Sequence, residues 1–322
     1  MEREMFAEKR VLITGAAGFI GSHLTDRLLE MGAMVIGYDN LNGGRTAFLE
    51  NAMKNERFRL IKADVLDSNA LSTALKGVDF VFHLAANPDV RLGERDSRIH
   101  FQQNVEATQN LIEAMRQVGV RNIFFTSTST VYGEADEIPT PESYGPTVPI
   151  SIYGASKLAS EAMISGFCHT YDMNAVIYRF ANVVGPRSTH GVTYDFVHKL
   201  RKNPKKLVIL GSGKQKKSYT YISDTIDAMI FAAENRKNRV EIFNMGSEDC
   251  IDVVRVADIV TETMGLKDVE YEFTGGIDGA GWKGDVRVMQ LSIEKLKSMG
   301  WRPRYNSEDS VRLTAESILS DI

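Results

Sequence analysis

The chain has 322 residues, of which 43% are hydrophobic and 25% charged, so it is long enough for one large globular domain or two moderate ones. Its formal net charge of −4 argues against nucleic acid as the main partner. The two cysteines form no CxxC pair, and no run of about 18 apolar residues occurs. We therefore expect a cytoplasmic protein without a metal site or a membrane span.

The first half of the chain alternates short apolar runs with helical patterns. The strand candidates lie at residues 11–14, 34–39, 58–64, 79–86, 122–128 and 175–182. Runs that are apolar on both faces suit a parallel sheet that helices cover on each side. The pattern predicts an α/β fold, a doubly wound parallel sheet of the Rossmann-like kind.

A glycine-rich stretch, "TGAAGFIGSH", follows the first strand candidate and contains Gly15, Gly18 and Gly21. Glycines there let the backbone approach a pyrophosphate, and the next helix offers it N-terminal amides. Asp39 ends the second strand, where a carboxylate can accept both ribose hydroxyls and would repel a 2′-phosphate, which favours NAD over NADP. Asp64 is placed to reach the adenine, although a position near a helix N-cap explains it equally well.

Two further stretches carry hydroxyl and amine groups: "STSTVYG" at 127–133 and "SIYGASKLASE" at 151–161. The first, taken alone, reads as a Ser/Thr loop after a strand. Together with TGxxGxxG, the pair Tyr153 and Lys157 resembles the extended short-chain dehydrogenase/reductase family. Four residues apart, the two side chains share a helix face. The lysine, helped by a positive nicotinamide, would lower the pKa of Tyr153 from about 10 toward neutrality and make it a general base.

The resemblance places the catalytic hydroxyl on Thr128, three residues before Val131. It leaves Ser127, Ser129 and Thr130 as structural or cofactor-side neighbours. Relatives that dehydrate or decarboxylate nucleotide sugars carry acidic residues after this hydroxyl, where this chain has Ser129 and Thr130. Oxidation followed by re-reduction, which is epimerisation, is the reaction that remains.

The resemblance covers nearly the whole chain and is strongest to UDP-glucose 4-epimerases, through "YDNLNGG", "HLAANPDVR", "YRFANVVGPR" and "GKQKKSYTYISD". It implies 4-epimerisation of a UDP-hexose (UDP-glucose/UDP-galactose, and also the N-acetyl forms), with NAD held tightly and regenerated in each turnover. The implied cofactor residues are Gly15, Gly18, Phe19, Ile20, Gly21, Asp39, Asn40, Asp64, Val65, Leu84, Ala85, Ala86, Asn104, Tyr153 and Lys157. The implied substrate residues are Asn182, Val208, Leu210, Lys217, Tyr219, Arg287 and Met289.

Two departures from the family pattern leave the nucleotide identity open. Lys217 stands where the family usually has arginine, which keeps the charge but loses bidentate phosphate geometry. Trp282 replaces a second arginine, for which Lys283 or Arg287 would have to compensate. The resemblance also places Met289 at the position that gates the 2-substituent of the sugar.

Proline and glycine break the chain into short pieces after about residue 183. We expect an NAD-binding domain at 1–182 and a mainly nucleotide-sugar-binding domain at 183–322, with a strand near 241–247 returning to the main sheet. The resemblance further implies a homodimer. One alternative is a nucleotide-sugar dehydratase or decarboxylase, which the absence of acidic residues after Thr128 disfavours. The other is a catalytically silent NAD-binding regulator, which the presence of Thr128, Tyr153 and Lys157 disfavours.

Overall fold

The computed structural model describes residues 5–321, which form two compact units. Unit 1 comprises residues 5–127, 155–178 and 229–243, and unit 2 comprises residues 128–154, 179–228 and 244–321. The chain therefore passes between the units several times. Residues 128–154, which we expected in the first domain, belong to unit 2.

Unit 1 is built on a seven-stranded sheet with the order β11-β6-β5-β4-β1-β2-β3. The pairings of β1 with β2 and β4, of β2 with β3 and of β4 with β5 are parallel. The strands are β1 (Arg10–Thr14), β2 (Met34–Asp39), β3 (Phe58–Lys62), β4 (Phe80–His83), β5 (Asn122–Thr128), β6 (Asn174–Phe180) and β11 (Val240–Met245). The predicted Rossmann-like α/β fold is confirmed, and β11, far along the chain, forms one edge of the sheet.

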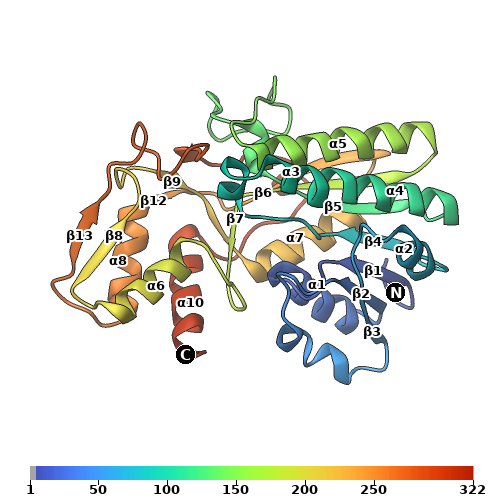
Figure 1. The fold of residues 1–322 in the computed structure, drawn as a ribbon, viewed down its shortest axis with the longest axis horizontal. Coiled ribbons are helices and arrows are strands. Elements are labelled where there is room, and N and C mark those ends of the chain that lie inside the picture. Colours follow the sequence, from blue (N-terminus) through green and yellow to red (C-terminus); the bar gives the residue numbers. More distant parts are fainter. Residues whose placement is uncertain (1–4, 322) are drawn as a thin grey trace. The chain divides into compact units, whose positions relative to one another are not determined.

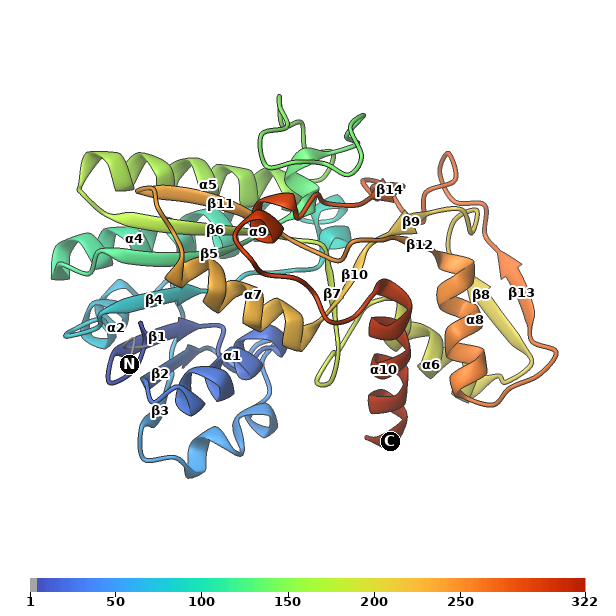
Figure 2. The same ribbon diagram turned by 180° about the vertical axis from the view of Figure 1, so that it is seen from behind.

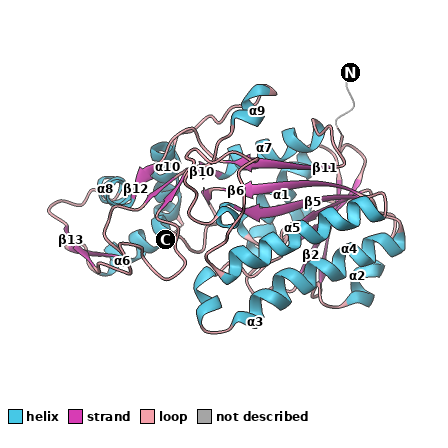
Figure 3. Ribbon diagram, turned by 90° about the horizontal axis from the view of Figure 1, so that it is seen from above, coloured by secondary structure: helices cyan, strands magenta, loops and turns pink. Residues whose placement is uncertain are grey.

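Helices cover both faces of this sheet. Figures 1 and 3 show α4 and α5 side by side along one face, whereas α1 lies on the other. The helices are α1 (Phe19–Glu30), α2 (Ser68–Ala74), α3 (Ser97–His100), α4 (Ala107–Val118), α5 (Ile152–Thr170) and α7 (Ile222–Glu234), with a π-helical stretch at Phe101–Glu106. Local signals set their ends: Asp67 caps α2, and Gly119 ends α4 in the left-handed conformation at φ +82°.

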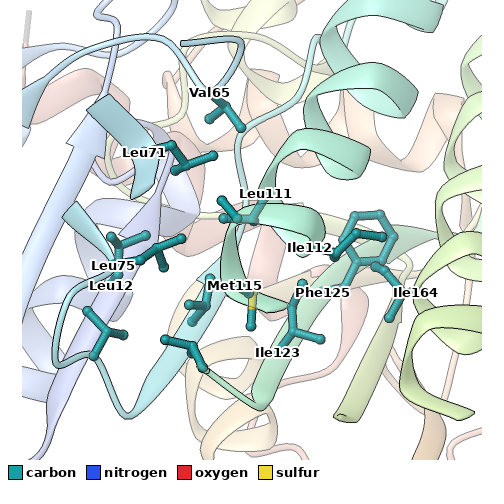
Figure 4. Packing of buried hydrophobic residues seen from close by; sticks show 14 of the residues in the cluster. Leu12, Val65, Leu71, Leu75, Leu111, Ile112, Met115, Ile123, Phe125 and Ile164 are labelled. Atoms are coloured by element: carbon teal, nitrogen blue, oxygen red, sulfur yellow. The ribbon is translucent and has the colours of Figure 1, made fainter. Parts of the chain in front are cut away.

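A hydrophobic cluster fills the space between the sheet and the helices α2, α4 and α5 (Figure 4). Leu12, Leu111, Ile123 and Ile164 in this cluster are fully buried. Side chains from four different elements thus interlock, and removal of one leaves a hole that its neighbours only partly close.

We expect Leu111→Ala to reduce the free energy of unfolding by about 2–5 kcal/mol, because it deletes three buried carbon atoms and opens a cavity. Urea denaturation followed by circular dichroism measures the change. Val148→Ala, at an exposed valine, is the control and should change stability by less than about 0.5 kcal/mol. Equal effects of the two substitutions would contradict the assignment of Leu111 to the core.

Unit 2 contains small sheets and a group of helices. Its strands pair as β10-β7, as β12-β9-β14 and as β13-β8. These strands are β7 (Asn182–Val184), β8 (Lys206–Ile209), β9 (Lys216–Lys217), β10 (Tyr219–Tyr221), β12 (Ile251–Asp252), β13 (Glu270–Phe273) and β14 (Val288–Met289). The helices are α6 (Val192–Lys202), α8 (Val253–Thr263), α9 (Glu294–Ser298) and α10 (Ser307–Ser320).

A second hydrophobic cluster holds unit 2 together. Figure 2 shows α6, α8 and α10 packed against one another, and Val197, Val260 and Val311 of these helices are fully buried. Asp252 and Asn306 cap α8 and α10 by accepting backbone N–H groups of Arg255 and Asp309. Among the described residues, no helix combines the length and apolar character needed to cross a bilayer.

Candidate active site

The glycine loop between β1 and α1 has the geometry of an anion cradle. Gly15 adopts φ +72°, and a Cβ atom there would lie 2.8 Å from the backbone nitrogen of Ala85. A Cβ atom on Gly21 would lie 2.1 Å from the carbonyl oxygen of Gly15. Gly18 caps α1 without a side chain, and the first turn of α1 has no acidic residue, so its amides and positive dipole end remain suited to an anion. These residues fit the pyrophosphate of a dinucleotide.

The carboxylate of Asp39 lies beside this loop at the end of β2. It is buried and accepts hydrogen bonds from the backbone nitrogens of Ala17 and Leu41, at 2.9 and 2.8 Å. These contacts fix its orientation and tie the end of β2 to the glycine loop. Phe19 and Ile20 form the first turn of α1.

Asp64 lies one strand further along the sheet. Its carboxylate accepts hydrogen bonds from the side chain of Asn40 at 2.8 Å and from the nitrogen of Leu66 at 2.9 Å. Asp67 is the N-cap of α2, so Asp64 lies near the start of that helix, three residues before the cap, and its contact with the adenine stays a prediction. Val65 is buried in the core cluster of unit 1.

The segment after β4 packs against the start of the glycine loop. The backbone nitrogens of Leu84 and Ala85 both donate to the hydroxyl of Thr14, at 3.2 Å, and Ala86 follows. The strand candidate 79–86 therefore ends three residues early, at His83. This termination brings the backbone of Ala85 against Gly15.

Asn104 is buried and held within the protein. Its amide oxygen accepts from the nitrogen of Asn87 at 2.8 Å, and its amide nitrogen donates to the hydroxyl of Ser156 at 2.9 Å. It thus joins the segment after β4 to α5. Direct cofactor contact by Asn104 stays a prediction.

His83 carried no role in the sequence analysis, yet it joins β1 to α4. Its Nδ1 lies 2.7 Å from the hydroxyl of Thr14, and its Nε2 lies 3.0 Å from that of Thr108. Burial and then the charge of Lys157 lower the pKa of His83 to about 3. The imidazole is therefore neutral at physiological pH, and the only sequence signal was a histidine at the end of an apolar run.

Thr128 and Tyr153 come together in unit 2, although they lie 25 positions apart in the sequence. The hydroxyl of Thr128 accepts from the backbone nitrogen and the hydroxyl of Thr130, each at 3.2 Å. A hydrogen bond from Thr128 to Tyr153 favours the phenolate, but burial has the larger effect and raises the pKa of Tyr153 to about 12. The chain by itself therefore does not lower this pKa toward neutrality.

Gly154 explains how α5 begins so close to the hydroxyl-rich turn. A Cβ atom on Gly154 would lie 2.7 Å from the carbonyl oxygen of Thr130. Only glycine allows this approach, and it places Tyr153 near Thr128. Gly154 had no predicted role, and its sequence signal was a glycine at the start of a helix.

Lys157 follows Tyr153 by one turn of α5. It is buried, and its ammonium nitrogen lies 4.3 Å from the ring centroid of Phe125 on β5. Burial lowers the pKa of Lys157 to about 7, while the carboxylate of Glu161 acts in the opposite direction. The charge of this lysine is therefore sensitive to its neighbours.

The predicted substrate residues all lie in unit 2. The amide nitrogen of Asn182 donates to the carbonyl of Ser218 at 3.1 Å, and Tyr219 on the neighbouring strand β10 is buried. Val208 on β8 and Leu210, just after it, are each 37% exposed, whereas Ile209 between them is buried. This alternation leaves two apolar side chains open to a ligand.

The basic candidates are already engaged by carboxylates. Lys217 forms an ion pair with the buried Asp285, and its nitrogen lies 5.3 Å from the ring centroid of Trp282. Arg287 binds Glu134 through two hydrogen bonds of 2.8 and 2.9 Å. The structure therefore brings Trp282 to Lys217 and holds Arg287 to a different partner.

Met289 on β14 lies opposite Lys217 on β9 and is buried. Its carbonyl oxygen accepts a hydrogen bond from the nitrogen of Ser218 at 3.0 Å.

The sequence model of the NAD dependent epimerase/dehydratase family matches residues 11–246, well over half of the chain. A putative UDP-glucose 4-epimerase of Methanocaldococcus jannaschii is 32% identical over 94% of this chain and 96% of its own length.

The chain belongs to the NAD-dependent epimerase/dehydratase family.

Solved members of this family have the same fold. A crystal structure of UDP-galactose 4-epimerase is 42% identical, with a TM-score of 0.87, and the match covers 97% of this chain and 99% of the other. The UDP-glucose 4-epimerase of Thermus thermophilus, solved in complex with NAD, is 31% identical with a TM-score of 0.85, and the match covers 97% and 100%. The cofactor of the family is NAD, and the glycine loop and Asp39 of this member suit it.

Relatives named for other reactions have similar sequence identity to this chain. The dTDP-D-glucose 4,6-dehydratase of Mus musculus is 30% identical over 96% of this chain and 88% of its own length. Family membership thus indicates NAD-dependent sugar-nucleotide chemistry and is compatible with more than one reaction.

Proposed function

We propose that this epimerase/dehydratase family member catalyses 4-epimerisation of a UDP-hexose through a 4-keto intermediate. The observation that carries the proposal is the pairing of Thr128 with Tyr153, followed one turn later by Lys157. Ser129 and Thr130, which follow Thr128, carry hydroxyls that do not ionise near neutral pH. These two positions therefore provide no general acid or base for a step beyond oxidation and re-reduction, such as dehydration.

Different residues would bind the cofactor, transfer the proton and orient the substrate. The loop of Gly15, Gly18 and Gly21, together with Asp39, would hold NAD, which supplies a hydride acceptor that returns the hydride in the same turnover. Tyr153 removes the proton of the sugar 4-hydroxyl as a hydride leaves C4, and it returns the proton after the ketone has been reduced on its other face. Thr128 donates a hydrogen bond to the reacting oxygen and orients it.

Proton removal needs a lower pKa than burial alone gives Tyr153. Opposite charge nearby stabilises a phenolate, and two sources are at hand: the ammonium of Lys157 one turn away and the positive ring of the oxidised cofactor. We therefore propose that Tyr153 becomes an effective base only in the NAD-bound protein.

The substrate end of the proposal rests on the side chains of unit 2. Val208 and Leu210 offer apolar contact for a uracil ring, and Lys217 offers positive charge for the diphosphate once it exchanges its contact with Asp285. Asn182, Tyr219 and Arg287 complete the proposed set. A homodimer remains an expectation from the resemblance.

We predict that Met289→Tyr selectively depresses the reaction of UDP-N-acetylglucosamine. Methionine is flexible and intermediate in width, so the wild-type protein should accept both UDP-glucose and its N-acetyl form. A rigid ring at this buried position would narrow the space for the larger 2-substituent. The ratio of kcat/KM for the two substrates measures the effect, and Met289→Leu is the volume-matched control. Equal losses on both substrates with Met289→Tyr would contradict the gate.

The direct test of the proposed function is incubation of the purified protein with UDP-glucose, UDP-galactose and their N-acetyl forms, followed by chromatographic separation of the products. We expect interconversion of the 4-epimers without added reductant and without net NADH formation. A stable 4-keto-6-deoxy sugar or a pentose would instead assign the chain to the dehydratases or decarboxylases. Binding of NAD without any turnover would indicate a regulator.

A further inference from the structure

A serine of the hydroxyl-rich run holds a buried carboxylate. Ser127 is 3% exposed, and its hydroxyl donates a hydrogen bond to the Oε1 atom of Glu161, which is 4% exposed. Ser127 lies near the end of β5 and Glu161 in the middle of α5, both in unit 1. Because an ionised carboxylate is costly to bury without partners, this pair calls for a positive charge nearby.

Lys157 supplies that charge, one turn before Glu161 on the same helix. Side chains four residues apart share a helix face, and attraction between the two charges acts on the lysine. Lys157 is itself 3% exposed, between α5 and the ring of Phe125. Ser127 and Phe125 are two residues apart on β5 and therefore share a face of the strand, which contacts Glu161 through Ser127 and Lys157 through Phe125.

Within residues 5–321, the other titratable groups around Lys157 offer no second negative charge. His83 faces it from β4 and is neutral at physiological pH. Tyr153 precedes it by one turn of α5 and is protonated in the chain by itself. Phe125, on β5, has no charge, and the polar neighbours Ser156 and Asn104 hydrogen-bond each other. Among these groups Glu161 is the one that favours the charged lysine.

We propose that Glu161 is a positioning residue of the reaction: held by Ser127, it keeps Lys157 charged, one turn of α5 after Tyr153. This inference rests on the proposed function for the role of Tyr153. It gives Ser127 a task separate from that of Thr128, since the serine hydroxyl binds a carboxylate rather than a substrate.

Glu161→Gln tests the proposal because the amide keeps the shape and removes the charge. Without the carboxylate, burial drives Lys157 to lose its proton at a lower pH, and Tyr153 then lacks a cationic neighbour. We expect the acid limb of the pH profile of kcat, and the appearance of tyrosinate absorbance in the NAD-loaded protein, to move upward by about one pH unit. The absorbance of the Tyr153→Phe double variant is subtracted to isolate Tyr153.

Two further variants separate positioning from folding. Ser127→Ala leaves both charges and should move the same pH limb in the same direction by less. Glu241→Gln is the matched control, since Glu241 is also buried in unit 1 but accepts hydrogen bonds from the backbone nitrogens of Lys237 and Asn238. It should lower thermal stability and leave the pH limb in place.

An unchanged pH limb and tyrosinate titration in Glu161→Gln would overturn the proposal, whatever the loss of stability. If that variant does not fold, an unchanged limb in Ser127→Ala overturns it. The tyrosinate titration needs no substrate, so it decides the role of Glu161 even if the sugar nucleotides tested are not turned over.

Discussion

Replacement of Tyr153 by phenylalanine should reduce kcat by about 10²- to 10⁴-fold, the usual contribution of a positioned general base. The substitution removes one oxygen atom and leaves the ring, so it deletes the base without enlarging the space around it. Hydride removal from C4 then has no group to take the hydroxyl proton. Steady-state epimerase assays with UDP-glucose and UDP-galactose measure the loss.

Binding should persist in this variant because the remaining contacts are unchanged. NAD content of the purified protein and calorimetric titration with UDP-glucose check this point. Tyr144→Phe is the control, since the hydroxyl of Tyr144 donates to the exposed carboxylate of Asp136 at 3.0 Å and not to Thr128. Near-normal turnover by Tyr153→Phe would remove Tyr153 from the mechanism and with it the proposed function of the hydroxyl-rich run.

Lys157→Met should give the second large effect, a loss of turnover together with a shift of the activity profile to higher pH. Methionine occupies similar space against the ring of Phe125 but carries no charge. Burial raises the pKa of Tyr153 to about 12. The substitution removes the ammonium of Lys157, one of the two positive charges that we propose stabilise the phenolate in the NAD-bound protein. The fraction of phenolate at neutral pH therefore falls. The pH dependence of kcat from pH about 6 to 10 measures the shift.

The same variant should also retain less NAD if the lysine contacts the nicotinamide ribose, as the resemblance implies. Lys54→Met, which removes an exposed lysine paired with Glu50, is the control and should change neither property. A Lys157→Met protein with reduced turnover but an unshifted pH profile would mean that the lysine acts only through cofactor binding.

Local features of the sequence determined the fold class, the glycine loop and the pairing of Tyr153 with Lys157. Apolar runs separated by helical patterns become parallel strands because such strands are buried on both faces, and the seven-stranded sheet follows. The glycine loop could also be predicted from the sequence, because the positive φ of Gly15 and the close approach of the backbone at Gly21 both require a residue without a side chain. The pairing of Tyr153 with Lys157 was readable because helical spacing is a local property.

The tertiary structure decided what depends on distant neighbours. The assignment of residues 128–154 to unit 2 follows from contacts across the chain and not from composition. Neither the ion pair of Lys217 with Asp285 nor the hydrogen bond of Ser127 to Glu161 has a spacing signature, since 68 and 34 residues separate the partners. The pKa of Tyr153 is the clearest case: the motif predicts a base, but packing sets the free energy of its charged form, because desolvation depends on every atom that surrounds the phenol.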